Sequence, residues 1–128
     1  MKRYRIFLID DDTEFRESVA ELLMEEDYLV DEAANGAVAI KQMAEPEYCP
    51  DLVLVDIAMP QMHGLEFIER VHKIDPVVPI VVCSSKSGLI DDYSLFSTGQ
   101  VRKFLTKPVD IEDLLTTLKE ILSEETLA

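Results

Sequence analysis

Three short runs of consecutive apolar residues constrain the fold of this chain more than any other feature. They are Ile6 to Ile9, Leu52 to Val55 and Ile80 to Cys83, and charged or turn-forming residues bound each of them. A strand with one face in water alternates apolar and polar residues, whereas a strand buried on both faces is apolar throughout. The runs therefore predict the central strands of a parallel sheet that is covered on both sides.

Amphipathic segments separate these runs and predict the covering helices. Weaker, more alternating strands are expected over Tyr28 to Ala33 and Lys103 to Thr106, at least one of them at an edge. The first expected helix is capped by Thr13, with Phe15, Val19, Leu22 and Leu23 inward and Arg16, Glu17, Glu21 and Glu25 facing water. Two more are expected from Gly36 to Ala44, with Val38, Ile40 and Met43 inward, and from Leu65 to Ile74, with Leu65, Ile68 and Val71 inward. A short helix is expected near Ile90 to Ser97, and the last runs from Ile111 to about residue 125, capped by Asp110. Strand and helix alternate five times, which predicts one α/β domain over residues 1–128.

Charge limits the partners of such a domain. Among 128 residues, 26 Asp and Glu stand against 12 Lys and Arg, so the net charge is −14. An acidic surface repels phosphate backbones and anionic lipid, so we expect no direct nucleic-acid or membrane binding and a preference for metal cations and basic partners. The chain has neither the roughly 20-residue apolar run of a membrane span nor a signal sequence, which predicts a cytoplasmic protein. Cys49 and Cys83 lack metal-ligand spacing, and Cys83 is expected to be a small buried apolar residue.

Polar residues that could carry chemistry follow the predicted strands. In open parallel sheets, ligands bind beyond the carboxyl ends of the strands, where the strand order reverses. At those ends stand Asp10-Asp11-Asp12, Asp56, Ser84-Ser85 and Lys107-Pro108. Clustered carboxylates repel one another unless a cation joins them, and Mg²⁺ prefers oxygen ligands. Carboxylates, Mg²⁺ and a lysine together form a site suited to phosphoryl transfer.

The same motifs resemble the receiver domain of a two-component response regulator over nearly the whole chain. The matching residues are Asp10-Asp11, Asp56-Ile57-Ala58-Met59-Pro60 with Gly64 after it, Ser84, and Phe104-Leu105-Thr106-Lys107-Pro108. Each motif alone is weak, but the four together in this order and spacing are specific. The resemblance implies a flavodoxin-like (βα)5 sandwich with a parallel sheet of order 2-1-3-4-5, the order that is known for this fold from the chemotaxis member of the same family.

The resemblance also implies a role for each acidic residue. Asp56 would be the phospho-acceptor, taking a phosphoryl group from a sensor histidine kinase or a phosphotransfer protein. Mg²⁺, or Mn²⁺ in its place, would be bound by Asp11, Asp56 and the backbone carbonyl of Ala58. Asp10 would act on this ion through a bound water. Lys107 would pair with Asp56 and later with the phosphoryl oxygens.

Two further residues are implied to connect this site to the surface. Ser84 would bind a phosphoryl oxygen after transfer, and Phe104 would occupy the position of an aromatic residue that moves inward on activation. The signal would reach an output domain or protein through the face formed by the 90–97 helix, the 103–106 strand and the last helix. Phosphorylation-dependent homodimerisation through this face is a further expectation. The Lys107-Pro108 bond would be cis, which proline permits at low cost.

Some positions depart from the usual family pattern. Ala58 provides no polar side chain toward the phosphoryl group, and Lys86 adds a positive charge nearby, so both bear on the lifetime of an acyl phosphate. Gln100 to Lys103 is one residue longer than the pattern. Gly64 is expected to supply a positive φ in the turn before its helix.

Two alternative functions stay open at this level. One is a degenerate receiver that binds partners without being phosphorylated, although every acceptor-site residue is present. The other is a small aspartyl-phosphate phosphatase of the haloacid-dehalogenase type. That family requires Thr or Val four residues after its nucleophile, where this chain has Glu14. Both a stand-alone regulator and the receiver part of a longer protein fit the sequence.

Overall fold

The protein is described from a computed structural model, and the structure describes residues 3–58, 64–85 and 99–127. Its elements are β1 (Arg5–Ile9), α1 (Thr13–Glu25), β2 (Leu29–Ala33), α2 (Gly36–Met43), β3 (Leu52–Val55), α3 (Gly64–Ile74), β4 (Ile80–Ser84), β5 (Val101–Thr106) and α4 (Ile111–Leu127). The helix predicted near residues 90–97 lies outside the described residues. Among the described residues, none of the helices combines the length and apolar character that a membrane span needs.

The five strands form one parallel sheet in the order β2-β1-β3-β4-β5, as the sequence predicts. The three continuous apolar runs are its three central strands, and the two weaker strands are its two edges. The chain moves outward from β1 to β2 and then returns past β1 to β3, so the order of strands reverses between β1 and β3. Ligand sites in such sheets lie beyond the carboxyl ends of the two strands at this reversal.

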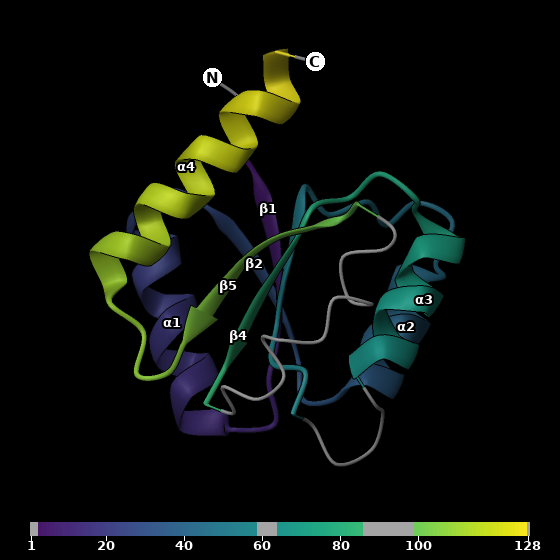
Figure 1. Ribbon diagram of the computed structural model, residues 1–128, viewed down its shortest axis with the longest axis horizontal. Helices are drawn as coiled ribbons and strands as arrows, with labels where there is room; N and C mark the ends of the chain where they lie inside the picture. Colours follow the sequence, from purple (N-terminus) through teal and green to yellow (C-terminus); the bar gives the residue numbers. More distant parts are fainter. Residues whose placement is uncertain (1–2, 59–63, 86–98, 128) are drawn as a thin grey trace.

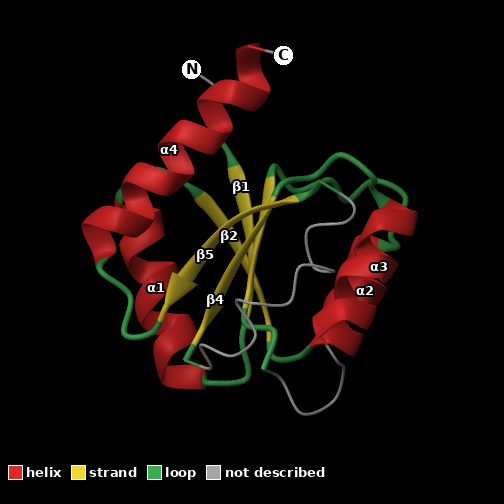
Figure 2. Cartoon of the chain, in the orientation of Figure 1, coloured by secondary structure: helices red, strands yellow, loops and turns green. Residues whose placement is uncertain are grey.

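Helices cover both faces of this sheet (Figure 1; Figure 2). Helices α1 and α4 lie on one side, and α2 and α3 lie on the other. Successive side chains of β1 alternate between the two apolar cores, because a strand turns alternate residues to opposite faces. Ile6 and Leu8 pack in the core under α1 and α4, whereas Phe7 and Ile9 pack in the core under α2 and α3. This double burial explains why the central strands are apolar throughout.

Side-chain caps begin helices α1, α2 and α4, and the cap of α1 differs from the prediction. Asp12 caps α1, since its backbone is extended and its carboxylate accepts a hydrogen bond from the Phe15 N–H at 3.2 Å. Thr13, the predicted cap, is the first helical residue. Asp110 caps α4 as expected, accepting from the Asp113 N–H at 3.1 Å. Caps of this kind satisfy backbone donors that have no partner within the helix.

The buried stripes of two helices are narrower than their apolar patterns. Leu22 on α1 and Val38 on α2 were expected inward, but they are 39% and 51% exposed. Both predictions are wrong: Ala39, one position further along α2, is buried in place of Val38, and on α1 Leu23, which was also predicted inward, is buried without Leu22. A helix with apolar residues at successive positions can turn more than one side inward, and the packing partner selects among these sides.

A bulge in β5 gives that strand one residue more than β4 over their paired stretch. Ile80 of β4 pairs with Val101, but the next residue, Val81, pairs with Lys103. Arg102 is therefore the extra residue, and both it and Lys103 are exposed. A bulge absorbs one added residue and restores the register beyond it. The carboxyl end of β5 consequently stays aligned with that of β4, with Ser84 opposite Thr106.

Gly64 is required for close approach and not, as predicted, for a positive φ. It is the first residue of α3, and the described glycine with a positive φ is Gly99, at 76°. A Cβ at position 64 would lie 2.6 Å from the Cβ of buried Ile57 and 3.3 Å from its carbonyl oxygen. The start of α3 therefore packs directly on the residue that follows Asp56.

We expect Gly64→Ala to lower the free energy of unfolding by about 1–3 kcal/mol, the usual cost of overpacking a filled site. The clash involves the backbone and Cβ of Ile57, which cannot turn away as a flexible side-chain end could. Urea denaturation followed by circular dichroism measures the change. Equal stability of the variant and the wild-type protein would show that α3 can shift freely away from Ile57.

Candidate functional site

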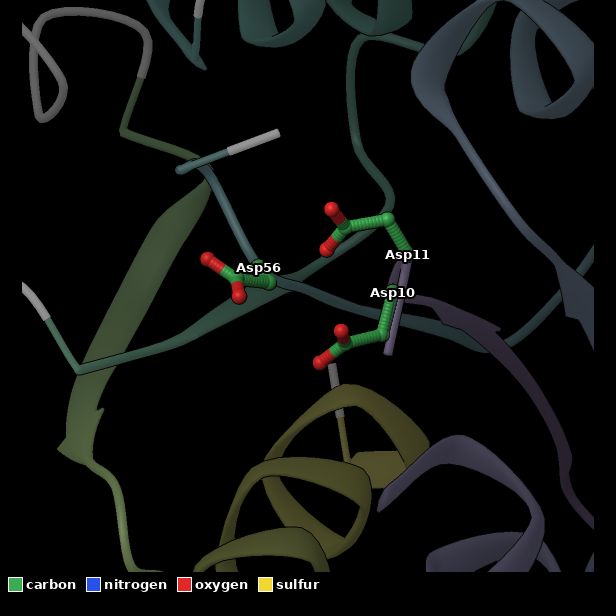
Figure 3. A group of neighbouring side chains, drawn as sticks. All are labelled: Asp10, Asp11 and Asp56. Atoms are coloured by element: carbon green, nitrogen blue, oxygen red, sulfur yellow. The ribbon is translucent and has the colours of Figure 1, made fainter. Parts of the chain in front are cut away.

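Three aspartates meet at the carboxyl ends of the two strands between which the sheet order reverses. Asp10 and Asp11 follow β1, and Asp56 follows β3 (Figure 3). Ile9 pairs with Val55, so the next residues are neighbours, and the Asp56 N–H donates to the Ile9 carbonyl at 3.0 Å. One carboxylate oxygen from each aspartate lies within 4.8 Å of the others. Asp10 and Asp56 are buried, at 1% and 6% exposure, whereas Asp11 is exposed.

Lys107 brings a positive charge to this cluster from the far edge of the sheet. Its Nζ donates to Asp10 Oδ2 at 2.7 Å and to Asp56 Oδ2 at 3.0 Å. The aromatic ring of Phe15 lies against the same ammonium, with its centroid 4.2 Å from Nζ. The backbone N–H of Lys107 donates to the Ser84 carbonyl, which ties the residue to the end of β4, and the Lys107-Pro108 bond is cis as expected. The predicted ion pair between Lys107 and Asp56 is present.

Burial and the ion pairs shift the pKa values of these groups. Burial by itself would lower the pKa of Lys107, but the hydrogen bonds to Asp10 and Asp56 outweigh it, so the pKa is raised and the ammonium stays charged. Burial raises the pKa of Asp10, although the hydrogen bonds from Lys107 and from the Asp12 N–H partly oppose the rise. Three carboxylates therefore share this cluster with the ammonium of Lys107.

The chemistry of these donors fits a hard divalent cation. All three side chains offer carboxylate oxygens, the ligands that Mg²⁺ prefers over nitrogen or sulfur. The exposed Asp11 leaves the cluster open to water on one side, and Mg²⁺ usually keeps several waters. The Asp10, Asp11 and Asp56 carboxylates are therefore the residues that could hold such an ion.

The remaining predicted residues lie in or next to β3, β4 and β5. Ser84 is buried at the end of β4, which lies next to β3, the strand that Asp56 follows. The Ala58 N–H donates to Asp56 Oδ1 at 2.8 Å, which places residue 58 beside the carboxylate. Phe104 is half-buried in β5 and packs against the core under α2 and α3. The coordinating role of the Ala58 carbonyl and the switching role of Phe104 stay predictions.

Cys83, Cys49 and His72 are not members of the aspartate cluster. Cys83 is buried, and burial raises the pKa of its thiol to about 12, so it remains a thiol at neutral pH. Cys49 is exposed. His72 Nδ1 lies 2.6 Å from the Oε1 of Gln100, whose amide nitrogen donates to the carbonyls of Asp75 and Val78. Lys86 lies outside the described residues.

One residue near the cluster was wrongly predicted to face water. The Arg16 side chain is only 13% exposed, and its Nη1 donates to the backbone carbonyl of Asp10 at 2.7 Å. Helical periodicity could not show this contact, because it compares positions within α1 and contains no information about the end of β1. A basic residue six positions after Asp10 is the only trace of it in the sequence.

Comparison with known proteins decides the family. A family model described as "Response regulator receiver domain" matches residues 6–119. The chain belongs to this family. It is a signalling receiver domain of the two-component type with a flavodoxin-like fold. The match includes all three clustered aspartates and Lys107.

Individual relatives of this receiver domain differ in length. The chemotaxis protein CheY of Bacillus subtilis is 29% identical over 121 residues, which cover 94% of this chain and 98% of CheY. A probable transcriptional regulator, ycf29 of Porphyra purpurea, is 31% identical over 97% of this chain. This chain spans only 59% of the length of that regulator.

Solved structures agree with the fold. The CheY-like receiver domain protein of Methanospirillum hungatei superposes with a TM-score of 0.89 at 29% identity, over 98% of both chains. The response regulator TrrA of Thermotoga maritima, solved in complex with Mg²⁺ and BeF, is 31% identical, with a TM-score of 0.79 over 91% of this chain and 97% of TrrA.

Proposed function

We propose that this receiver domain accepts a phosphoryl group on Asp56 from a histidine kinase or a phosphotransfer protein and then changes its surface to signal to an output domain or partner. The observation that carries the proposal is the Lys107 ammonium bridging Asp10 and Asp56, with Asp11 in the same cluster. A carboxylate nucleophile held beside a fixed cation is the arrangement that phosphoryl transfer requires.

Asp56 is oriented for this reaction by hydrogen bonds to both of its oxygens. Oδ1 accepts from the Ala58 N–H and Oδ2 accepts from Lys107 Nζ. A carboxylate oxygen of Asp56 attacks the phosphorus of a phosphohistidine whose other ring nitrogen is protonated. The bond from phosphorus to nitrogen breaks, the electron pair leaves with a neutral imidazole, and the product is an acyl phosphate. Lys107 then pairs with a phosphoryl oxygen, and the hydroxyl of Ser84 donates to another.

Asp10, Asp11 and Asp56 would hold Mg²⁺, or Mn²⁺ in its place, together with the Ala58 carbonyl and with Asp10 acting through a water. Mg²⁺ bound there would neutralise the negative charge of the carboxylates and of the incoming phosphoryl group. The support for this proposal is the oxygen-only donor set of three neighbouring carboxylates, two of which pair with Lys107.

The signal would travel through the junction of β4 and β5. Ser84 and Thr106 are paired across these strands, and the Lys107 N–H is bonded to the Ser84 carbonyl, so new contacts at the phosphoryl group act on both strand ends. Contacts present only after phosphorylation can shift a two-state surface that includes β5, Phe104 and α4, and a nearly complete shift needs about 5 kcal/mol. This surface is the proposed site for output partners and for a phosphorylation-dependent homodimer.

Mass spectrometry after incubation with Mg²⁺ and acetyl phosphate tests the proposal. We expect one added phosphoryl group, released by hydroxylamine as an acyl phosphate, and no adduct when the metal is chelated. No adduct under any condition would identify a degenerate receiver that acts only by binding. Continuous release of phosphate from an aryl phosphate would identify a phosphatase instead.

Ala58→Asn is expected to shorten the lifetime of the acyl phosphate with little effect on Mg²⁺ affinity. Residue 58 lies beside Asp56 through its 2.8 Å backbone hydrogen bond, and an added amide there can hold an attacking water. One such neutral hydrogen bond corresponds to at most about a tenfold change in rate. The decay of the labelled protein after removal of the donor measures this lifetime. Identical decay in both proteins would contradict the expectation.

A further inference from the structure

The guanidinium of Arg16 joins three elements behind the acidic cluster. Its Nη1 donates to the Asp10 carbonyl at 2.7 Å, and its Nε donates to Glu32 Oε1 at 3.1 Å. Arg16 belongs to the first turns of α1, Glu32 to β2 and Asp10 to the end of β1. The Arg16 side chain is 13% exposed and the Glu32 side chain is 36% exposed. The guanidinium that contacts the Asp10 carbonyl is therefore largely shielded from water.

The Asp10 carbonyl is the group through which Arg16 acts on the cluster. The Asp10 N–H donates to the Ala33 carbonyl at 3.1 Å, and Asp10 Oδ1 accepts from the Asp12 N–H at 2.9 Å. Arg16 completes this set by holding the carbonyl. That carbonyl and the Asp11 N–H belong to one planar peptide unit. Holding the oxygen therefore fixes the orientation of the peptide plane that precedes the Asp11 Cα. Asp11 is exposed, so the direction of its backbone bears directly on where its carboxylate lies.

We propose that Arg16, anchored by Glu32, is a positioning residue that orients the Asp10-Asp11 peptide so that the three carboxylates bind a divalent cation together. The inference rests on the proposed metal site. Arginine suits this role because its fork of donors can engage two acceptors at once, and a bond from a charged donor to a carbonyl is stronger than a neutral one.

Positioning and simple electrostatics predict opposite results when Arg16 is removed. Removal of a positive charge near three carboxylates should strengthen the binding of Mg²⁺ by Coulomb attraction alone. Loss of the group that orients a ligand should weaken it, and removal of such supporting partners typically costs about 10–100-fold in metal affinity. The sign of the change therefore separates the two accounts.

The experiment measures the Mg²⁺ dissociation constant of the 128-residue chain by calorimetry, for the wild-type protein and for Arg16→Gln, Arg16→Lys and Arg70→Gln. We expect Arg16→Gln to bind Mg²⁺ at least about tenfold more weakly. Arg16→Lys keeps the charge, so electrostatics alone predicts no change, but one ammonium cannot reproduce the fork and we expect weaker binding. Arg70→Gln is the matched control, because Arg70 also pairs with a glutamate, Glu66, but on the exposed surface of α3.

A second readout needs no metal. Hydrogen exchange of the Asp12 backbone N–H, which donates to Asp10 Oδ1, is measured by NMR in metal-free protein and is expected to be faster in both Arg16 variants and unchanged in Arg70→Gln. Unchanged or tighter Mg²⁺ binding in Arg16→Lys would overturn the inference while leaving the metal site intact. If the wild-type chain binds no Mg²⁺, the proposed metal site fails and the inference fails with it. The two failures are thus distinguishable even if Arg16→Gln does not fold.

Discussion

Asp56→Asn is expected to abolish phosphoryl labelling by acetyl phosphate and Mg²⁺, with a fall of at least about a hundredfold, because loss of a nucleophile costs far more than this in measured enzymes. The amide has no anionic oxygen to attack phosphorus. Asn can still accept the hydrogen bond that the Ala58 N–H donates to Asp56 Oδ1, and Lys107 keeps its contact with Asp10. The variant should therefore fold, and mass spectrometry of the intact protein measures the loss.

The matched control is Asp51→Asn, which makes the same change just before the opposite end of β3. Asp51 accepts a hydrogen bond from the Arg5 N–H at 2.7 Å, and an asparagine oxygen can preserve it. Labelling of this variant should equal that of the wild-type protein. Persistent labelling of Asp56→Asn at the wild-type rate would place the acceptor elsewhere and overturn the proposed role of Asp56.

Lys107→Met is expected to lower both the stability and the labelling rate. The lysine side chain is 15% exposed and pairs with Asp10, which is 1% exposed, so methionine leaves a buried carboxylate without its cation. Removal of one partner of a buried pair costs about 3 kcal/mol or more. Loss of one charged donor at a phosphoryl site should also slow labelling by about 100-fold or more. Urea denaturation and time-resolved labelling measure the two effects separately.

The stability loss in Lys107→Met should depend on pH in a defined direction. Burial already raises the folded-state pKa of Asp10, and without Lys107 that pKa rises further, whereas the unfolded chain keeps the ordinary value near 4. At a pH below that ordinary pKa, Asp10 is protonated in both the folded and the unfolded state, so the stability loss from burying its charge is absent. As pH rises from there toward the folded pKa, the unfolded state loses its proton first, so the penalty grows.

Two variants control this experiment. Lys103→Met removes an equivalent charge from an exposed position on β5 and should change the free energy of unfolding by no more than about 0.5 kcal/mol. Adding Asp10→Asn to Lys107→Met removes the group that cannot be buried as an anion, so most of the lost stability should return. A pH-independent loss that Asp10→Asn does not repair would mean that Lys107 stabilises the fold by packing alone.

The sequence indicated the sheet and the members of the acidic cluster because both depend on local pattern and on a general rule. Continuous apolar runs mark strands buried on both faces, and parallel strands bring their carboxyl ends to one edge. Asp10, Asp11 and Asp56 could therefore be placed at the same edge of the sheet, where they cluster if β1 and β3 are neighbours. The strand order itself, and the reach of Lys107 to the cluster, came from the resemblance to receiver domains.

Packing between elements decided what those patterns could not. Arg16 was expected in water, Val38 was expected inward and Gly64 was expected to need a positive φ, and each expectation was wrong for the same reason. Helical periodicity and residue type describe a segment alone, whereas the Asp10 carbonyl, the partner face of α2 and the Ile57 backbone come from other parts of the chain.

The amino-acid sequence by itself determined that this protein is a layered α/β domain with carboxylates at one edge of its sheet, since burial periodicity and strand polarity are properties of short segments. Only the tertiary structure decided which charges touch. Lys107 and Asp10 are 97 residues apart in the chain and 2.7 Å apart in the fold. A contact of that kind depends on the register of four strands and on the helices packed against them.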